Sequence, residues 1–193
     1  MIAALLVAAG YLCGSVPFGV LLTRLRRGVD VRGSGSGNIG ATNVARVAGK
    51  KLGAVVLLLD AAKGALPVLA SLWLVPDSPR LHAFVGLAAF LGHVFPVWLK
   101  LRGGKGVATA LGVLLVLVPW AALSGAAVWL ACVLVLRISS VGSLLGGLVA
   151  VAVAFFTARQ DAYALLTAGL FGMMLFTHRG NITRLLRKSE RKL

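Results

Sequence analysis

The sequence contains very few acidic residues: five Asp and Glu stand against 20 Lys and Arg among 193 residues. Charged residues of both signs make up 13%, about half the fraction usual in a globular domain, whereas hydrophobic residues make up 59%. The five acids and three histidines are too scattered to form a metal cluster, so we expect neither a metal nor a cofactor. This composition excludes an ordinary globular domain and predicts a membrane protein that crosses the bilayer several times.

Cysteine is also scarce, since only Cys13 and Cys132 occur and both lie within apolar runs. We interpret them as core filling without a disulfide. The formal net charge of +15 raises the possibility of nucleic-acid binding, but the basic residues lie between the apolar runs, as in cytoplasmic loops. Attraction to anionic membrane lipid explains such a pattern, and no nucleic-acid partner is expected.

The apolar runs predict an all-α polytopic membrane protein with seven transmembrane helices, the N-terminus outside and the C-terminus cytoplasmic. Residues 1–193 are expected to form a single integral membrane domain. No basic residue precedes Arg24, so we expect a retained first helix over residues 2–23, kinked at Pro17, and not a cleaved signal peptide. The stretch 107–136 is too long for one crossing and predicts two short helices that turn near Pro119. The other helices are expected over residues 52–75, 81–101, 143 to about 157, and 162–177.

A glycine-rich polar segment, residues 33–46, separates the first two apolar runs and is expected to be a loop. Closely spaced glycines allow backbone N–H groups to turn inward around an anion, and an arginine offers a fork for phosphate. A flexible linker is the alternative, although the continuation Ile-Gly-Ala-Thr-Asn-Val-Ala-Arg is unlike a linker. The candidate binding residues in this segment are Gly35, Ser36, Gly37, Asn38, Thr42, Asn43 and Arg46.

Three further polar segments are predicted on the same side of the membrane. The first contains Gly103, Gly104, Lys105 and Gly106 directly before a helix start, which is a typical anion site but lacks the Walker A spacing. The second, residues 137–143, includes Ser143, and the third, residues 178–184, includes His178 and Asn181. Four polar segments with almost no acid predict a pocket for one or more anionic groups at the inner membrane surface.

Charged groups are also expected inside the membrane. Asp60 and Lys63 share one helical face, either as a mutually neutralising structural pair or as part of the polar site. His82 is expected near the outer interface. His93 precedes Pro96, which frees a backbone carbonyl that the imidazole can satisfy.

Several motifs occur in order along nearly the whole chain: Gly-Ser-Gly-Asn-Ile-Gly-Ala-Thr-Asn from residue 35, Asp-x-x-Lys-Gly from 60, Gly-His-x-Phe-Pro from 92, Gly-Gly-Lys-Gly-Val-Ala-Thr from 103, and His-x-x-Asn-Ile-x-Arg-Leu from 178. Together they resemble the bacterial acyl-phosphate:glycerol-3-phosphate acyltransferases, the PlsY family. The chain departs from the family near its end, where Lys188 stands in place of the usual Gly before Glu190. That departure leaves Glu190 without an assigned role.

The resemblance implies transfer of an acyl group from acyl phosphate to the 1-hydroxyl of glycerol 3-phosphate, giving 1-acylglycerol 3-phosphate and phosphate. Both substrates carry phosphate, and the donor is already activated, so positioning and charge stabilisation supply most of the acceleration. Ser36, Arg46, Lys105, His178 and Asn181 are the candidate catalytic residues, and Ser143 and Lys63 join the glycines and asparagines as binding residues. Either His178 is the general base, or a substrate phosphate takes the proton while His178 orients it.

The resemblance further implies a bacterial inner-membrane location with the active site at the cytoplasmic face. The expected partners are acyl phosphate, glycerol 3-phosphate and membrane lipid, with no obligate protein partner. A phosphate-ester transporter is the competing class, since it would use the same anion sites. It would favour paired broken helices near the middle of the membrane, and no convincing inverted repeat occurs in the sequence.

Overall fold

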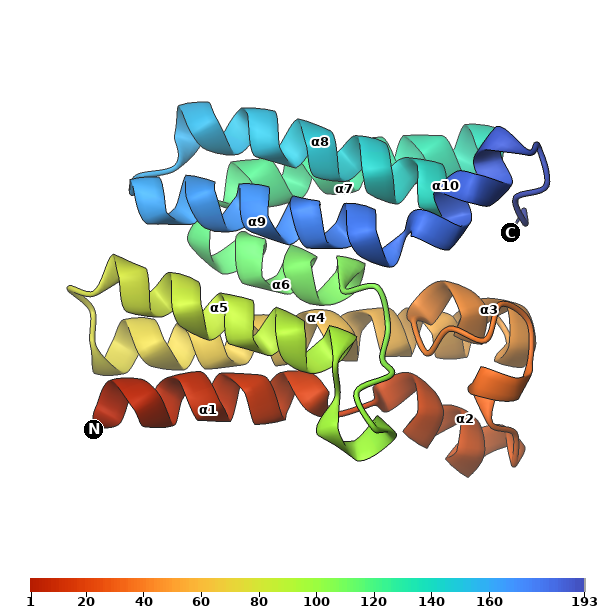
Figure 1. Cartoon of the computed structure of the whole chain (residues 1–193), viewed down its shortest axis with the longest axis horizontal. Helices are drawn as coiled ribbons and strands as arrows, with labels where there is room; N and C mark the ends of the chain where they lie inside the picture. Colours follow the sequence, from red (N-terminus) through yellow and green to blue (C-terminus); the bar gives the residue numbers. More distant parts are fainter. Residues whose placement is uncertain (193) are drawn as a thin grey trace. The chain divides into compact units, whose positions relative to one another are not determined.

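The protein is described by a computed structural model that covers residues 1–192, and every regular element in that range is helical. Figure 1 shows the helices in chain order. The α-helices are α1 (Ile2–Ser15), α2 (Phe18–Arg27), α3 (Ala41–Ala48), α4 (Lys50–Leu74), α5 (Pro79–Val94), α6 (Val107–Leu117), α7 (Pro119–Leu136), α8 (Ser139–Thr157), α9 (Asp161–Thr177) and α10 (Arg179–Leu186). Two short 3-10 helices, η1 (Val31–Gly33) and η2 (Val97–Leu99), lie between them.

Within the described residues, five helical stretches are long and apolar enough to cross a membrane, the first being α1 together with α2. The apolar helices α6 and α9 are shorter. The five long stretches and the two shorter helices occur in the order that the sequence predicts. The all-helical class is confirmed. That all seven cross the bilayer, and in which direction, stays a prediction.

Two predicted helix breaks are confirmed at prolines. Helix α1 ends at Ser15 and α2 begins at Phe18, so the first stretch is interrupted at Pro17. Helix α6 ends at Leu117 and Pro119 begins α7, which separates the long apolar stretch into two helices. Proline lacks an N–H and occupies the first turn of a helix more readily than its interior, which explains both positions.

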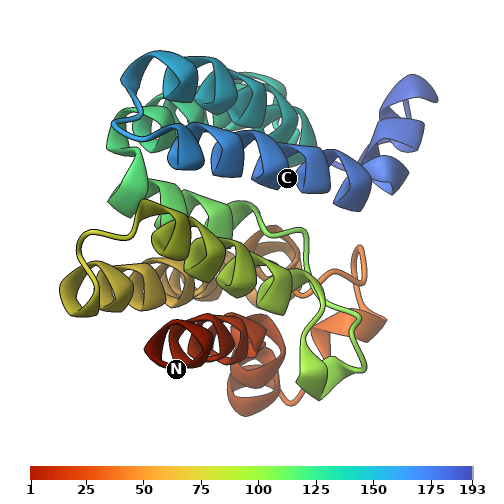
Figure 2. The ribbon, with the colours of Figure 1, turned by 60° about the vertical axis from the view of Figure 1, so that its left-hand side comes forward.

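The chain forms two compact units, Met1–Val113 and Leu114–Leu193. In the first unit, helices α1, α4 and α5 pack side by side, as Figures 1 and 2 both show. Helices α2 and α3 pack on α4 at one end of this group. Their shared core is built from Val20, Val31, Ile39, Val44 and Val56.

Helix α3 corrects the prediction that residues 33–46 form a loop throughout. Residues Ala41–Ala48 are helical because Val44 and Ala48, one turn apart, are both buried in the core beside α4. This short amphipathic helix directly follows glycines and polar side chains that are typical of a loop. After Gly33, which ends η1, the polar segment is therefore a loop over residues 34–40 followed by a helix that carries Thr42 and Arg46.

In the second unit, α7 and α8 form one antiparallel pair and α8 and α9 the next. Gly142 and Gly146 on α8 lie close to the backbone of α7. A Cβ atom added to Gly146 would lie 2.4 Å from the carbonyl oxygen of Gly125 on α7, so only glycine permits this approach. Helix α10 begins immediately after α9, with His178 at the junction.

Candidate functional site

Asn43 holds the glycine-rich loop of the first unit together. Its Nδ2 donates to the carbonyl oxygens of Val31 at 3.1 Å, Ser34 at 3.1 Å and Asn38 at 2.9 Å. Its Oδ1 accepts from the backbone N–H of Ser36 at 2.8 Å, and the side chain is buried. The amide predicted to bind substrate phosphate is thus committed to the loop itself, which makes Asn43 a residue that shapes the site.

The other predicted residues of this loop have different surroundings. Asn38 folds back, its Oδ1 accepting from the N–H of Gly40 at 2.8 Å directly before α3. Ser36 is exposed, and Thr42 and Arg46 lie one turn apart on α3, both half-buried. The arrangement brings hydroxyl, amide and guanidinium groups together around the start of a helix, where the N–H groups favour an anion.

Asp30, at the entrance to the same loop, is neutralised by two arginines. Its carboxylate receives Arg32 Nη2 and Arg24 Nη2, each at 2.6 Å, and it caps η1 by accepting the Arg32 N–H. The hydrogen bonds from Arg32, followed by that from Arg24, hold the pKa of Asp30 well below its ordinary value. The one acid of this segment is therefore already paired before any anionic substrate arrives.

The segment of residues 103–106, here called the lysine loop, is fixed to the end of α5. The N–H groups of Gly103 and Gly104 donate to the carbonyl oxygens of Val94 and His93 at 3.0 and 3.1 Å. Gly106 has a φ of 84°, and a Cβ there would lie 2.1 Å from the ring of Phe90. Lys105 is half-buried between these glycines and stands two residues before the first residue of α6.

Within the helices of the first unit, Lys63 lies against Asp60 as the spacing predicted. Its Nζ is 2.8 Å from Asp60 Oδ1 and donates to the carbonyl oxygen of Val16 at 2.7 Å. Both side chains are only 2% exposed. This position gives the ammonium group two protein partners, so the structure provides no support for Lys63 as a direct phosphate ligand.

His93 differs from its prediction. The carbonyl groups near Pro96 accept hydrogen bonds from the N–H groups of the lysine loop and from the Tyr11 hydroxyl, and not from the imidazole. The ring nitrogen Nδ1 of His93 instead faces Asp60 Oδ1 at 3.7 Å. The sequence interpretation was wrong because two glycine N–H groups, about ten residues further along the chain, donate hydrogen bonds to these carbonyl groups.

His82, on the same helix, is buried, and its Nε2 lies 2.8 Å from the carbonyl oxygen of Val75. Because a carbonyl can only accept, Nε2 carries the proton and donates it. His82 therefore has a local structural role at the other end of α5. Cys13 and Cys132 are free thiols, as predicted.

The second unit places its predicted residues at one end of the antiparallel pair α8 and α9. Ser143 lies in the second turn of α8 and donates to the carbonyl oxygen of Ser139 at 2.9 Å. His178 joins α9 to α10, and its Nδ1 lies 2.8 Å from the carbonyl oxygen of Met174. That bond puts the ring proton on Nδ1, so the proton-accepting atom of the neutral ring is Nε2.

Asn181 and Arg184 are both tied to Glu190. Asn181 Nδ2 donates to Glu190 Oε1 at 2.7 Å, and Arg184 Nε donates to Oε2 at 2.9 Å. Partial burial disfavours the charged carboxylate, but the hydrogen bonds from Asn181 and Arg184 outweigh it and lower the pKa of Glu190 below its ordinary value. Glu190 thus orients Asn181, a role that its place in a basic tail did not reveal.

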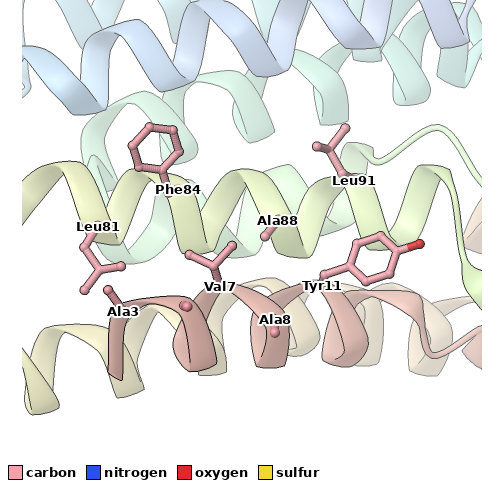
Figure 3. A pocket seen from close by; sticks show the side chains of 9 residues that line it. Ala3, Val7, Ala8, Tyr11, Leu81, Phe84, Ala88 and Leu91 are labelled. Atoms are coloured by element: carbon pink, nitrogen blue, oxygen red, sulfur yellow. The ribbon is translucent and has the colours of Figure 1, made fainter. Parts of the chain in front are cut away.

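An apolar groove runs between α1 and α5 in the first unit and has a volume of about 650 Å³. Figure 3 shows Val7, Ala8 and Tyr11 on α1 opposite residues of α5. The hydroxyl of Tyr11 donates to the carbonyl oxygen of Phe95 at 2.7 Å, just beyond the end of α5. The groove's lining is Ala3, Ala4, Val7, Ala8, Tyr11, Leu81, Phe84, Ala88 and Leu91.

Comparison with known proteins identifies the family. A family model for glycerol-3-phosphate acyltransferases matches residues 4–188. The chain belongs to the glycerol-3-phosphate acyltransferase family. The glycerol-3-phosphate acyltransferase of Myxococcus xanthus is 68% identical over 97% of each chain, and that of Anaeromyxobacter sp. strain Fw109-5 is 55% identical over 97% of this chain and 95% of its own.

Solved structures of this glycerol-3-phosphate acyltransferase family confirm the resemblance to PlsY. The glycerol 3-phosphate form of PlsY, an integral membrane acyltransferase, matches with a TM-score of 0.95 at 39% identity, covering 100% of this chain and 96% of that chain. Its lysophosphatidic acid form matches with a TM-score of 0.92 at 37% identity and the same coverage. With the five membrane-length helices, these matches make the chain a multi-pass membrane protein.

Replacing Asn43 by Asp is expected to loosen the glycine-rich loop. Asp has nearly the same shape but puts an oxygen where Nδ2 now donates to three carbonyl groups, and each buried acceptor left unsatisfied costs about 1–3 kcal/mol. We expect tryptic cleavage after the exposed Arg32 to become at least about tenfold faster in detergent. Wild-type cleavage rates in Asn43→Asp would contradict the holding role.

Replacing Glu190 by Gln is expected to destabilise the second unit at neutral pH by about 1–3 kcal/mol, because an amide nitrogen then faces Arg184. The wild-type contribution is present above the ordinary Glu pKa of 4.5 and is lost as the pH falls through the lowered pKa of the folded protein. The midpoint temperatures of thermal unfolding of wild type and Glu190→Gln should therefore differ at pH 7 and coincide in strong acid. A pH-independent difference would contradict this assignment.

Proposed function

We propose that the protein transfers a fatty acyl group from acyl phosphate to the 1-hydroxyl of glycerol 3-phosphate. The products are 1-acylglycerol 3-phosphate (lysophosphatidic acid) and inorganic phosphate, and the reaction is the first acylation of phospholipid synthesis. The observation that carries the proposal is the lysine loop, whose backbone is pinned to α5 so that Lys105 stands before the start of α6. A cation and helix N–H groups in one place suit a phosphate group.

The chemistry needs no protein nucleophile. The hydroxyl oxygen of glycerol 3-phosphate attacks the acyl carbonyl carbon, a new C–O ester bond forms, and the bond from that carbon to the phosphate oxygen breaks. Phosphate leaves with the bonding electrons, and the hydroxyl proton passes to a base. The protein's part is to bring the reactants together and to stabilise negative charge on the leaving phosphate.

The residues of the first unit supply two kinds of contact in this proposal. Arg46 and Lys105 neutralise phosphate charge, while Ser36, Asn38 and Thr42 hold the donor phosphate with neutral hydrogen bonds. The glycines Gly35, Gly37, Gly103, Gly104 and Gly106 allow the backbone to come close. Asn43 contributes by keeping the first loop in shape.

The residues of the second unit, Ser143, His178 and Asn181, act on glycerol 3-phosphate in this proposal. His178 is suited to accept the hydroxyl proton because its Nδ1 is committed to the Met174 carbonyl, which leaves Nε2 as the basic atom. In the alternative, a phosphate oxygen of a substrate accepts the proton and His178 orients the hydroxyl. Removing His178 would lower the rate in both cases but would change the shape of the pH–rate profile only in the first.

The membrane orientation follows from charge. The segments that carry the proposed site are rich in Lys and Arg, as cytoplasmic loops are, which puts the site at the cytoplasmic face of the bacterial inner membrane. The N-terminus would then lie outside and the C-terminus inside. Acyl phosphate would enter from the bilayer with its phosphate at that face.

The apolar groove between α1 and α5 is a suitable place for the acyl chain. It has an apolar lining along both helices, and its Tyr11 end lies at the end of α5 to which the lysine loop is attached. Residues 3 to 11 of α1 span about 12 Å along the helix axis, enough for a large part of a fatty chain. A chain in this groove would have its activated end toward the phosphate-binding loops.

The decisive experiment measures phosphate release by the purified protein in lipid, given palmitoyl phosphate with and without glycerol 3-phosphate. We expect release that depends on glycerol 3-phosphate and falls about 100-fold or more in Lys105→Gln, because a cation that neutralises the phosphate of glycerol 3-phosphate is lost. Lys100→Gln is the matched control, since Lys100 is an exposed lysine of the same connection. Its rate should stay within about twofold of wild type.

Folded wild-type protein without acceptor-dependent release would overturn the proposed acyl transfer. Accumulation of glycerol 3-phosphate in sealed vesicles without any acyl donor would then favour a transporter. Release that is equal in Lys105→Gln and wild type would remove Lys105 from the site while leaving the reaction in place.

Filling the groove should change the response to chain length. Ala8→Trp is expected to lower the rate with palmitoyl phosphate about tenfold relative to a short-chain acyl phosphate, because a long chain buries more apolar surface there. Ala9→Trp adds the same ring beside it, at an exposed residue outside the groove lining, and should leave the ratio unchanged. If Ala8→Trp and Ala9→Trp had the same ratio of the rate with palmitoyl phosphate to the rate with a short-chain acyl phosphate, the acyl chain would lie elsewhere.

A further inference from the structure

A buried polar cluster in the first unit has no part in the reaction described above. Asp60 and Lys63 on α4 and His93 on α5 have side chains that are only 2–3% exposed. Burying an ion pair in hydrocarbon surroundings is costly, and replacing such a pair with apolar residues often stabilises a protein. Stability alone is therefore a weak reason for these three residues to lie together.

The cluster connects to two interruptions of the apolar helices. At one side, Lys63 Nζ donates to the carbonyl of Val16 at the α1–α2 break and lies 5.7 Å from the centre of the Phe18 ring. At the other side, His93 belongs to the last turn of α5, whose carbonyl groups receive the lysine loop. The three side chains thus form a continuous polar connection from the first break to the phosphate-binding segment.

His93 touches the lysine loop through its ring as well as its backbone. A Cβ atom added to Gly104 would lie 2.1 Å from His93 Nε2, so the imidazole rests directly on the glycine backbone. The carbonyl oxygen of His93 accepts the Gly104 N–H at 3.1 Å. The next residue is Lys105, whose place is set by the backbone that His93 supports.

The other ring nitrogen explains why a histidine occupies this position. His93 Nδ1 is buried, has no hydrogen-bond partner within residues 1–192 and faces Asp60 Oδ1 at 3.7 Å. The attraction between this side of the ring and the carboxylate fixes the ring plane against Gly104. Asp60 is in turn held by Lys63, which completes the connection.

We propose that Asp60, Lys63 and His93 are positioning residues that fix the backbone of the lysine loop and thereby the place of the Lys105 ammonium group. The effect on substrate rests on the proposed function, whereas the effect on the loop does not. Loss of the cluster should therefore raise the KM for glycerol 3-phosphate more than it lowers kcat. The KM for acyl phosphate should change less.

The test compares variants of His93 with a control on the same helix. His93→Leu keeps the bulk but removes the polar atoms, and we expect the KM for glycerol 3-phosphate to rise about tenfold. His93→Gln, which again offers a polar group toward Asp60, should restore at least part of that loss. His82→Leu removes a buried histidine at the other end of α5 and should lower thermal stability without raising KM.

Hydrogen exchange of a peptide containing residues 103–106 gives a readout that needs no substrate. Exchange at Gly103 and Gly104, whose N–H groups bond to the end of α5, should become about tenfold faster in His93→Leu and Asp60→Asn. It should remain at the wild-type rate in His82→Leu. If the wild-type protein proves to have no acyl transfer activity, accelerated exchange in His93→Leu and Asp60→Asn would still support the cluster, and only the proposed function would be overturned.

Gly104→Ala tests the direct contact. The added methyl group collides with the His93 ring, so the variant should lose at least about tenfold in kcat/KM, and the same change should cost several-fold less in a His93→Ala background. The proposal would be overturned if Gly104→Ala lowered kcat/KM by the same factor in the wild-type and His93→Ala backgrounds. Unchanged loop exchange in His93→Leu, or no rescue by His93→Gln, would overturn it as well.

Discussion

The structure depends on one constraint: a membrane interior offers no water to backbone groups that a broken helix leaves unpaired. Helix α5 ends just before Pro96, and the carbonyl groups of Val94 and Phe95 would have no partner there. Gly103 N–H serves the first and the Tyr11 hydroxyl serves the second. At the α1–α2 break, the carbonyl of Val16 receives Lys63. Each of these two breaks is closed by a residue from elsewhere in the chain.

The same closures determine where the proposed phosphate-binding elements lie. The lysine loop cannot drift from α5, because detaching it would leave carbonyl groups unpaired next to hydrocarbon, at about 1–3 kcal/mol each. Phe90 and His93 occupy the space beside Gly106 and Gly104, so side chains at those positions would force the loop away. A loop fixed in this way would be held ready for the proposed phosphate, which would lower the ordering cost of binding.

Much of this architecture can be predicted from the sequence because its determinants are local. Hydrophobic length predicts the apolar helices, proline predicts the breaks at residues 17 and 119, and a spacing of three predicts the Asp60–Lys63 pair. Helix α3 was not predicted, since its apolar face is short and follows a glycine-rich run. Its helical state depends on a core made with α2 and α4, which no local pattern contains.

The candidate site is less predictable, because the role of each residue depends on its tertiary partner. An asparagine in a polar motif is equally suited to bind phosphate or to hold the loop, and only the contacts of Asn43 with three carbonyl groups distinguish these roles. Glu190 stands nine residues from Asn181, a separation with no helical periodicity, so its contact follows from the turn after α10. The contacts of His93 depend on which N–H groups bond to the carbonyl groups at the end of α5, and these come from Gly103 and Gly104.

The few acidic residues of the chain are either paired with cations or lie away from the polar segments. Asp30, Asp60 and Glu190 are each held by at least one cation: Arg24 and Arg32 for the first, Lys63 for the second, and Arg184 for the third. The other two, Asp77 and Asp161, lie at the helix ends opposite the lysine loop on α5 and opposite His178 on α9. No acid is thus left uncompensated near the polar segments of either unit within residues 1–192. Because an unpaired carboxylate would repel a phosphate over about 10 Å at moderate salt, this arrangement keeps such repulsion away from the proposed anionic substrates.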